Sequence, residues 1–162
     1  TPPGLRPTTE FDLDWVVRVE HDPANADFIT TWPRARHSAL LREPHSRHFV
    51  VVDAAGERLG YVILRGIGEP DGCVELLRIV IAEPGRGVGR AVLRLVKQMV
   101  FEELDAHRLW LDVVTTNERA RALYRSEGFV EEGILREAAR RPSGFVSLVL
   151  MSMLEQEYQA DD

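Results

Sequence analysis

The sequence predicts an α/β protein with a mixed central sheet. A buried-strand pattern over 73–82 passes through a glycine-rich turn into an amphipathic helix over 88–104, and an apolar run over 107–114 follows. Strand, helix and strand in this order form a crossover, so these two strands should be parallel. Two β-rich runs, 48–53 and 59–65, flank a turn and predict an antiparallel hairpin beside that unit.

Capping and helix-breaking residues place the elements at the start of the chain. Thr8 and Thr9 precede apolar residues at helical spacing, which predicts a first helix of about three turns. A second helix begins at Pro33 and extends to about Leu41. The segment between the helices, 21–32, is irregular and is a candidate wall of a substrate site.

The last elements are a capped helix and a hairpin. Asn117 is a suitable N-cap for a helix over 118–127. Two further strands, 129–137 and 145–153, form a closing hairpin, and the polar tail from about 155 to 162 should fray. With 162 residues, 44% of them hydrophobic, the whole chain 1–162 is expected to be one domain with one core.

Composition narrows the classes of function. The formal net charge of −6 argues against nucleic acid as the main partner, because phosphate neutralisation needs a basic face. The single cysteine, Cys73, allows no intramolecular disulfide, and the histidines lack metal-ligand spacing, so no metal is predicted. No apolar run approaches the roughly 20 residues needed to span a bilayer. A cytoplasmic protein without membrane contact is expected.

The glycine-rich turn has the layout of a phosphate-binding loop. Gly85, Gly87 and Gly89 let the backbone take positive φ and approach a ligand, and the first turn of the following helix adds unpaired amides. A Walker-type loop needs Lys-Ser or Lys-Thr after its last glycine, whereas Arg90-Ala91 follows here. The spacing also differs from a dinucleotide fingerprint, which disfavours a nucleotide-dependent oxidoreductase.

A second motif carries a family resemblance. The run from Asn117 through Ala120 to Tyr124, followed by Gly128-Phe129, resembles the Asn-x-x-Ala-x-x-x-Tyr signature of the GNAT superfamily, the GCN5-related N-acetyltransferases. The resemblance covers 75–154. It implies a GNAT-like mixed, mostly antiparallel central sheet with a parallel splayed strand pair flanked by helices. It also implies acetyl-CoA as co-substrate and an amine as acceptor.

The resemblance assigns residues to the cofactor. The strand before the loop would offer backbone groups to the pantetheine arm, the loop amides would hold the pyrophosphate, and Asn117 would contact the arm. The cofactor-binding candidates are therefore Ile79, Val80, Ile81, Gly85, Arg86, Gly87, Val88, Gly89, Arg90 and Asn117. Pro84 stands where the family usually has Gln or Arg, so Arg86 or Arg90 would compensate.

Transfer to an amine needs a base, an oxyanion donor and a proton for the departing thiolate. Glu75, the acid within an apolar strand, is the candidate base, and the alternative is a solvated strand residue or an ion pair with Arg78 or a neighbour. Tyr124 is the candidate acid by resemblance, and the amide of Ile81 the candidate oxyanion donor. Asp112 is a further candidate for recognising substrate charge, although an outward position on its strand is the simpler interpretation.

The acceptor is not identified by any pattern in the sequence. A small-molecule amine such as a polyamine, amino acid or antibiotic fits, and so does a protein N-terminus. By family analogy, the segment 21–32 and the closing hairpin would line the acceptor side. The alternative function is a non-catalytic acyl-CoA sensor with the same fold, and exposed closing strands could support a homodimer.

Overall fold

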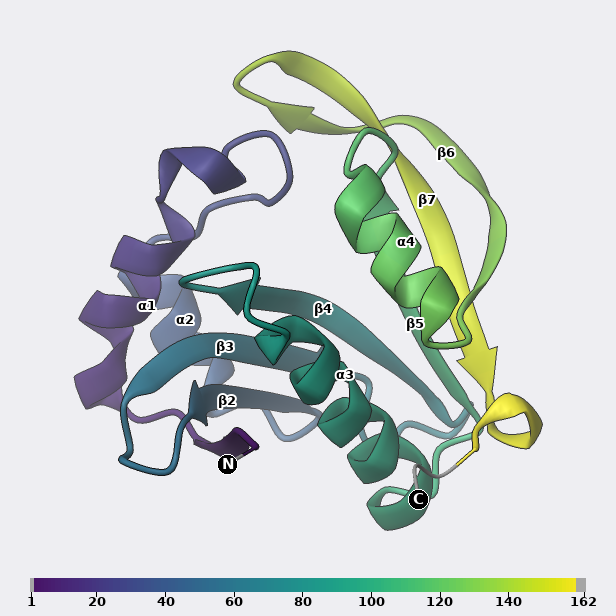
Figure 1. Cartoon of the computed structure of the whole chain (residues 1–162), viewed down its shortest axis with the longest axis horizontal. Coiled ribbons are helices and arrows are strands. Elements are labelled where there is room, and N and C mark those ends of the chain that lie inside the picture. The colour runs from purple at the N-terminus through teal and green to yellow at the C-terminus, as the bar shows by residue number, and fades with distance from the viewer. Residues whose placement is uncertain (1, 160–162) are drawn as a thin grey trace.

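The structure, a computed structural model, describes residues 2–159. Within these residues the centre is a seven-stranded sheet in the order β1-β2-β3-β4-β5-β7-β6 (Figure 1). Its strands are β1 (Gly4–Pro7), β2 (Ser46–Val52), β3 (Arg58–Arg65), β4 (Cys73–Ile81), β5 (Arg108–Val114), β6 (Val130–Arg141) and β7 (Gly144–Leu154). Among the strands so described, β4 and β5 are parallel and the other neighbours antiparallel, which confirms the predicted fold class.

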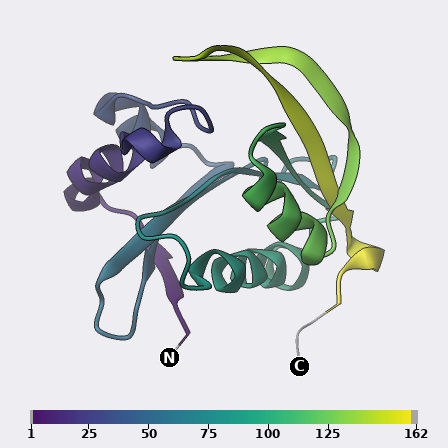
Figure 2. The same ribbon diagram turned by 45° about the horizontal axis from the view of Figure 1, so that its top comes forward.

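Helices cover both faces of the sheet. The α-helices are α1 (Leu13–Glu20), α2 (Arg34–Leu40), α3 (Val88–Gln98) and α4 (Glu118–Ser126). Short helical turns are η1 (Glu10–Asp12), η2 (Pro23–Asn25), the π-helical η3 (Met99–Glu103) and η4 (Glu155–Glu157). Figures 1 and 2 show α1 and α2 on one face of the β2–β4 half and α3 on the other. No helix within the described residues is long and apolar enough to cross a membrane.

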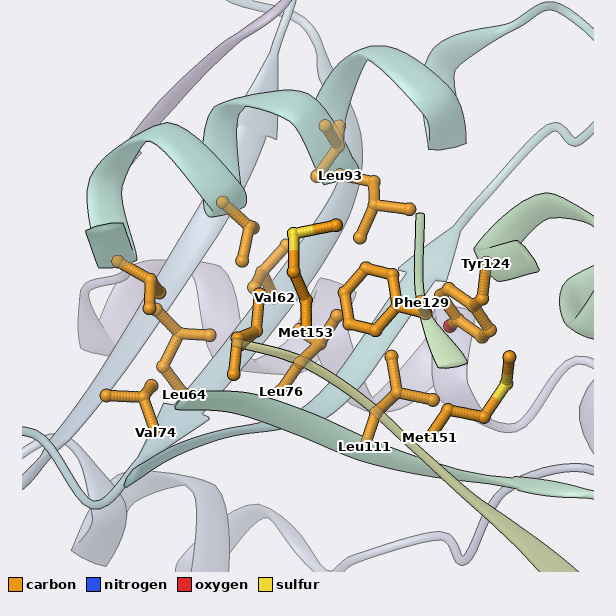
Figure 3. Packing of buried hydrophobic residues seen from close by; sticks show 14 of the residues in the cluster. Val62, Leu64, Val74, Leu76, Leu93, Leu111, Tyr124, Phe129, Met151 and Met153 are labelled. Atoms are coloured by element: carbon orange, nitrogen blue, oxygen red, sulfur yellow. The ribbon is translucent and has the colours of Figure 1, made fainter. Parts of the chain in front are cut away.

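Strand β3 divides the core between these two layers. Its side chains alternate between faces, so Val62 and Leu64 pack in the larger cluster with Leu93 of α3, where Figure 3 shows them. Tyr61 and Ile63 point the other way and join the smaller cluster under α1 and α2. These four consecutive side chains of β3 are all fully buried. The apolar run predicted at 59–65 therefore belongs to a strand covered on both sides.

Three elements differ from the sequence-based expectations. Strand β1 was not predicted, and the helix expected over 88–104 is α3 continued by the π-helical η3. The closing hairpin is longer than predicted, because β6 reaches Arg141 and β7 begins at Gly144. Irregular pairing of β6 with β7, where Glu137 has a φ of 45°, lets the strand continue past its expected end. Of the tail expected to fray, 155–157 form η4 and 160–162 lie outside the described residues.

Candidate active site

The parallel strands β4 and β5 separate soon after they meet. They pair at Cys73–Arg108, Val74–Leu109 and Glu75–Trp110, and no pairing follows in the described chain. Against β3, Leu76 pairs with Leu64 and Arg78 with Ile63, so Leu77 is an extra residue on β4. Such a bulge bends a strand and increases its twist, and β5 is held on its other side by β7. Figure 1 shows the resulting divergence of β4 from β5.

A cavity of about 280 Å³ lies where the strands diverge. Its walls come from β4 and β5, from α4 with its cap Asn117, from the segment that follows η2, and from the β6–β7 hairpin. The segment after η2 contributes Phe28, Ile29 and Thr30, and the β6–β7 hairpin contributes Arg141 among others. The two segments expected to line the acceptor side therefore do border this cavity. An adjoining cavity of about 520 Å³ shares Ile29, Thr30 and Arg141 with it.

The glycine-rich loop lies at the N-terminus of α3. Gly85 and Gly87 have φ values of 98° and 75°, as predicted, and Gly87 is the N-cap. The first amide-to-carbonyl bond at this end runs from Ala91 to Gly87 at 3.2 Å, which leaves the amides of the first turn without helical acceptors. The prediction of positive φ was wrong for Gly89, which lies inside α3; a Cβ there would stand 3.7 Å from Leu123.

Cations surround this loop, but not all of them face it. Arg86 forms an exposed ion pair with Glu83 at 3.2 Å. Arg90 donates to Ser126 Oγ at 3.0 Å and pairs with Glu127, so its guanidinium is already bound by α4 and the residue after it. Sequence reasoning missed a third arginine: Arg119 Nη2 lies 3.7 Å from the position of a Cβ on Gly85. An arginine in the first turn of the capped helix was the available signal.

Tyr124 and Asn117 both border the cavity from the α4 side. Tyr124 is 8% exposed, packs edge-on against Phe129 with ring centroids 5.8 Å apart, and its hydroxyl has no hydrogen-bond partner within the described residues. Burial, and secondarily the charge of Asp112, raises the pKa of this phenol to about 12. Asn117 caps α4 through Oδ1, which accepts from the amide of Ala120 at 3.3 Å, while the residue also lines the cavity.

The two candidate carboxylates have different surroundings. Glu75 does not line the cavity; its Oε1 accepts from Arg65 Nη2 at 2.9 Å and from Nε at 3.1 Å, so the expected ion pair is with Arg65. Asp112 does line the cavity and forms no hydrogen bond there with the described residues. Burial raises the pKa of Glu75, although Arg65 opposes it, and desolvation raises the pKa of Asp112, opposed by Arg141. Asp112 is thus the carboxylate that a molecule in the cavity would meet.

A profile described as the Acetyltransferase (GNAT) family matches residues 14–129, which is most of the chain. The chain belongs to this family. N-alpha-acetyltransferase RimI of Mycobacterium tuberculosis is 34% identical over 115 residues, 67% of this chain and 68% of that protein. Spermidine N(1)-acetyltransferase of Vibrio cholerae is 32% identical over 119 residues, 73% of this chain and 69% of that protein.

Solved structures of the family show the same fold. A spermidine N-acetyltransferase from Vibrio cholerae in complex with CoA and spermine has a TM-score of 0.87 and 25% identity. The match covers 96% of this chain and 97% of that one. This GNAT chain is therefore an acetyl-CoA-dependent N-acetyltransferase that acts on an amine. The oxidoreductase alternative is excluded, and the glycine loop with its free amides suits the co-substrate.

This acetyltransferase also contains a buried polar network that the sequence did not reveal. Glu20 Oε2 accepts from Arg78 Nη1 at 2.8 Å and from the Tyr61 hydroxyl at 2.5 Å, and Oε1 accepts from the amide of Trp32. His37 Nε2 lies 2.9 Å from Glu20 Oε2 and is fully buried. Burial, the largest single effect, would raise the pKa of Glu20, but these hydrogen bonds and the charge of Arg78 together lower it to about 2.

The network continues from His37 away from the cavity. His37 Nδ1 lies 3.1 Å from His48 Nε2, and His48 Nδ1 lies 2.7 Å from Thr8 Oγ1. If His37 Nε2 donates to the carboxylate of Glu20, one set of neutral tautomers satisfies every hydrogen bond in the chain. His37 Nδ1 then accepts from His48 Nε2, and His48 Nδ1 accepts from the Thr8 hydroxyl. Burial lowers the pKa of His48 to about 3, and the neighbouring His37 is the next cause. The network holds Arg78, a residue of the cavity wall, in one position.

Proposed function

We propose that the acceptor amine binds in the 280 Å³ cavity and attacks acetyl-CoA between Asp112 and Tyr124. The observation that carries this proposal is that Asp112 and Tyr124, neither of which has a hydrogen-bond partner among residues 2–159, border one cavity beside the splayed strands. The acceptor is a small-molecule amine or a peptide N-terminus. Relatives named as spermidine N-acetyltransferases and as an N-alpha-acetyltransferase support both classes.

The cofactor assignment follows the unpaired edge of β4. The backbone of Ile79, Val80 and Ile81 lies past the last β4–β5 pair, so its outward groups are available to the amides of an extended ligand. The pyrophosphate would bind the amides of Gly85 to Arg90 at the helix N-terminus, with Arg119 beside the loop. Pro84 adds no side-chain donor here, and Arg90 is engaged by Glu127, so Arg86 and Arg119 supply the positive charge.

The transfer proceeds in steps that balance. The neutral amine forms a bond to the carbonyl carbon of the acetyl group, and the amide of Ile81 stabilises the oxyanion. The carbon–sulfur bond then breaks and its electron pair leaves on sulfur, to which Tyr124 donates a hydrogen bond. Because the pKa of Tyr124 is about 12, full proton transfer to a thiolate with an ordinary pKa of about 8.5 is unfavourable. The proton released by the amine restores the balance and ends on the thiol.

Asp112 is the proposed first acceptor of that amine proton, directly or through water, and it passes the proton on to the departing thiolate. It borders the cavity, whereas Glu75 is held by Arg65 outside the lining residues. A raised carboxyl pKa favours proton uptake from an ammonium group. Glu75 remains the candidate predicted from the sequence, and it lies close enough for the charge of Asp112 to raise its pKa.

Calorimetric titration with acetyl-CoA, followed by thiol release with a panel of amines, tests the proposal. Tyr124→Phe should lower turnover about 100-fold, the range for loss of one positioned hydrogen-bond donor, while the dissociation constant for acetyl-CoA stays within about twofold. Tyr158→Phe is the matched control, since its hydroxyl bonds to Glu102 away from the cavity. Unchanged turnover in Tyr124→Phe would remove the phenol from the mechanism.

A further inference from the structure

Arg141 is a cation in the cavity wall whose hydrogen-bonding capacity is only partly used. The residue ends β6 and borders both cavities. Its Nη1 donates to the carbonyl oxygen of Arg140 at 3.1 Å. Its Nε is buried and has no hydrogen-bond partner within the described residues. A buried guanidinium donor left without an acceptor is unfavourable, so a ligand acceptor at this position would be stabilising.

A second guanidinium borders the same cavity. Arg78 is 7% exposed, packs with its guanidinium carbon 4.6 Å from the ring centroid of Trp32, and is fixed by Glu20. Burial, and secondarily the charge of Arg78, lowers the pKa of Arg141, while the charges of Asp112 and Asp27 oppose this shift. Two neighbouring guanidinium groups with planar donor sets are typical of a site for a carboxylate or phosphate.

The cavity offers one accessible carboxylate to a cationic ligand. Among the described lining residues of the 280 Å³ cavity, Asp112 is the acid. Two acids border the adjoining cavity: Glu20 has both oxygens occupied by protein donors, and Asp22 accepts from the amide of Ala24 through Oδ1. A polyamine brings several ammonium groups and would need several free carboxylates, and it would place one of its charges near Arg141. The charges in this cavity suit a molecule with one amine and one anionic group.

We infer that the acceptor carries a carboxylate, bound by Arg141 beside Arg78, while its amine faces Asp112 and Tyr124. This inference rests on the proposed function, because it assumes that the acceptor occupies the same cavity. The carboxylate has two possible sources: the α-carboxylate of a free amino acid, or an acidic side chain near the N-terminus of a peptide. Both present the same group to the guanidinium pair.

Matched acceptors test the inference by replacing one carboxylate with a neutral amide of nearly the same size. The first pair is an α-amino acid and its amide, and the second is a blocked-C-terminus dipeptide with Asp or Asn as its second residue. Spermidine is the third arm. In the wild-type protein, the kcat/KM for the acid of at least one pair should exceed that for its amide by about tenfold or more, the factor expected of a charge-assisted hydrogen bond. The pair that discriminates identifies the source.

Arg141→Met should reduce that acid-to-amide ratio to about one without changing acetyl-CoA binding. Arg136→Met is the matched control, because Arg136 is an exposed residue of the same strand and borders neither cavity. Thermal unfolding of each variant verifies folding. Ratios near one in the wild-type protein, or a preference for spermidine, would overturn the inference while leaving the transferase intact. Acetyl-CoA binding without thiol release from any acceptor would instead refute the proposed function.

Discussion

Replacing Glu20 by Gln tests how much of the stability depends on the buried network. The carboxylate accepts from Arg78, Tyr61, His37 and the amide of Trp32, and its side chain is fully buried. In its better orientation the Gln side chain keeps its oxygen toward the first three donors. Its amide nitrogen then faces the Trp32 amide, so two donors oppose each other, and Arg78 loses its countercharge.

The magnitude follows from these losses. An unsatisfied buried donor is unfavourable by about 1–3 kcal/mol, and each bond that is no longer charge-assisted weakens by about 1 kcal/mol. The sum agrees with the roughly 3–5 kcal/mol measured when one partner of a buried ion pair is removed. For a chain of this size, about 2–4 °C per kcal/mol gives a decrease in Tm of about 6–20 °C.

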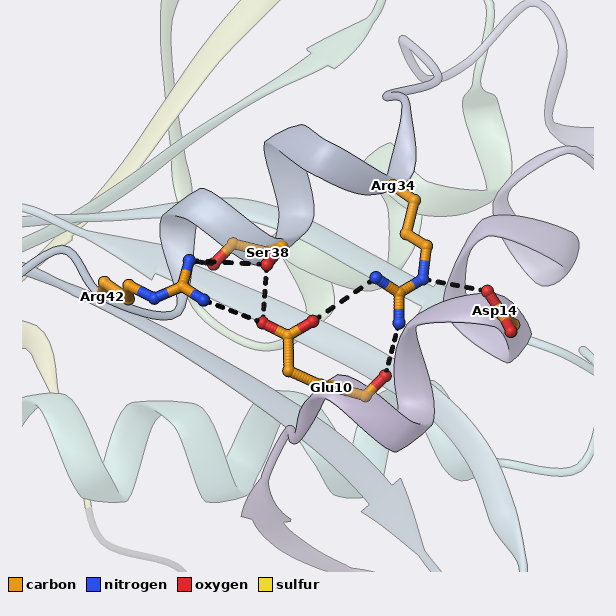
Figure 4. A network of polar contacts seen from close by, with 5 residues as sticks. All are labelled: Glu10, Asp14, Arg34, Ser38 and Arg42. Carbon is orange, nitrogen blue, oxygen red and sulfur yellow. Dashed lines mark hydrogen bonds and ion pairs between the residues drawn. The ribbon is translucent and has the colours of Figure 1, made fainter.

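Urea unfolding followed by circular dichroism measures the loss, and Glu10→Gln is the control. Figure 4 shows Glu10 between Arg34 and Arg42, with Ser38 donating to it at 2.6 Å. That carboxylate is 45% exposed, so its ion pairs at 3.4 and 3.3 Å should contribute about 0–1 kcal/mol. A decrease of less than about 1 kcal/mol for Glu20→Gln would refute the reasoning, since the buried carboxylate would then behave like the exposed one.

Three further predictions concern the site and its pH dependence. If Asp112 is the base, Asp112→Asn should abolish the acidic limb of the pH–rate profile and Glu75→Gln should keep it; the reverse result would restore the sequence-based assignment. Gly87→Ala should lower the unfolding free energy by about 1–2 kcal/mol because φ is 75°, and it should also weaken acetyl-CoA binding. Gly56→Ala, at a φ of 83°, is the control and should show only the loss of stability. If both variants bound acetyl-CoA with the same affinity, the glycine-rich loop would be excluded from cofactor binding. The pKa of His48 is lowered to about 3, so its contribution to stability is present above pH 6.5 and is lost as pH falls toward 3. Between pH 6.5 and 5, the unfolding free energy of His48→Gln should therefore fall less than that of the wild-type protein. The same dependence of unfolding free energy on pH in both proteins would contradict a neutral buried ring.

Local pattern was sufficient to predict the unit from β4 to α4. Alternation, helical spacing, the glycine turn and the Asn117 cap each act over a few residues, so the elements that they specify can be predicted from short stretches of the sequence. Strand β1 was missed because it is short and ends in Pro7, a residue that usually argues against strand structure. The separation of β4 from β5 was implied by family resemblance, while its local cause, the extra residue Leu77, requires knowledge of the register with β3.

The charged groups of the site required tertiary information. Glu20, His37 and Arg78 are far apart in sequence, and each alone has the pattern of an ordinary polar residue beside an apolar stripe. Arg141 was predicted to lie in the turn of the closing hairpin, whereas the longer β6 places it in the cavity wall. Asp112 was expected outward and is exposed, but only the structure shows that it also borders the cavity beside the separated strands.

The short contact between β4 and β5 also affects how a ligand enters and leaves. Beyond Glu75–Trp110 the facing edges of the two strands, as far as the structure describes them, are not paired, so an extended molecule can add hydrogen bonds there without breaking any between strands. Binding and release of the ligand then require no breaking of hydrogen bonds between strands, and the barrier to ligand exchange is set by the contacts of the ligand itself. Because these strand edges are already unpaired, the sheet can bind a new acetyl donor in every catalytic cycle without rearranging.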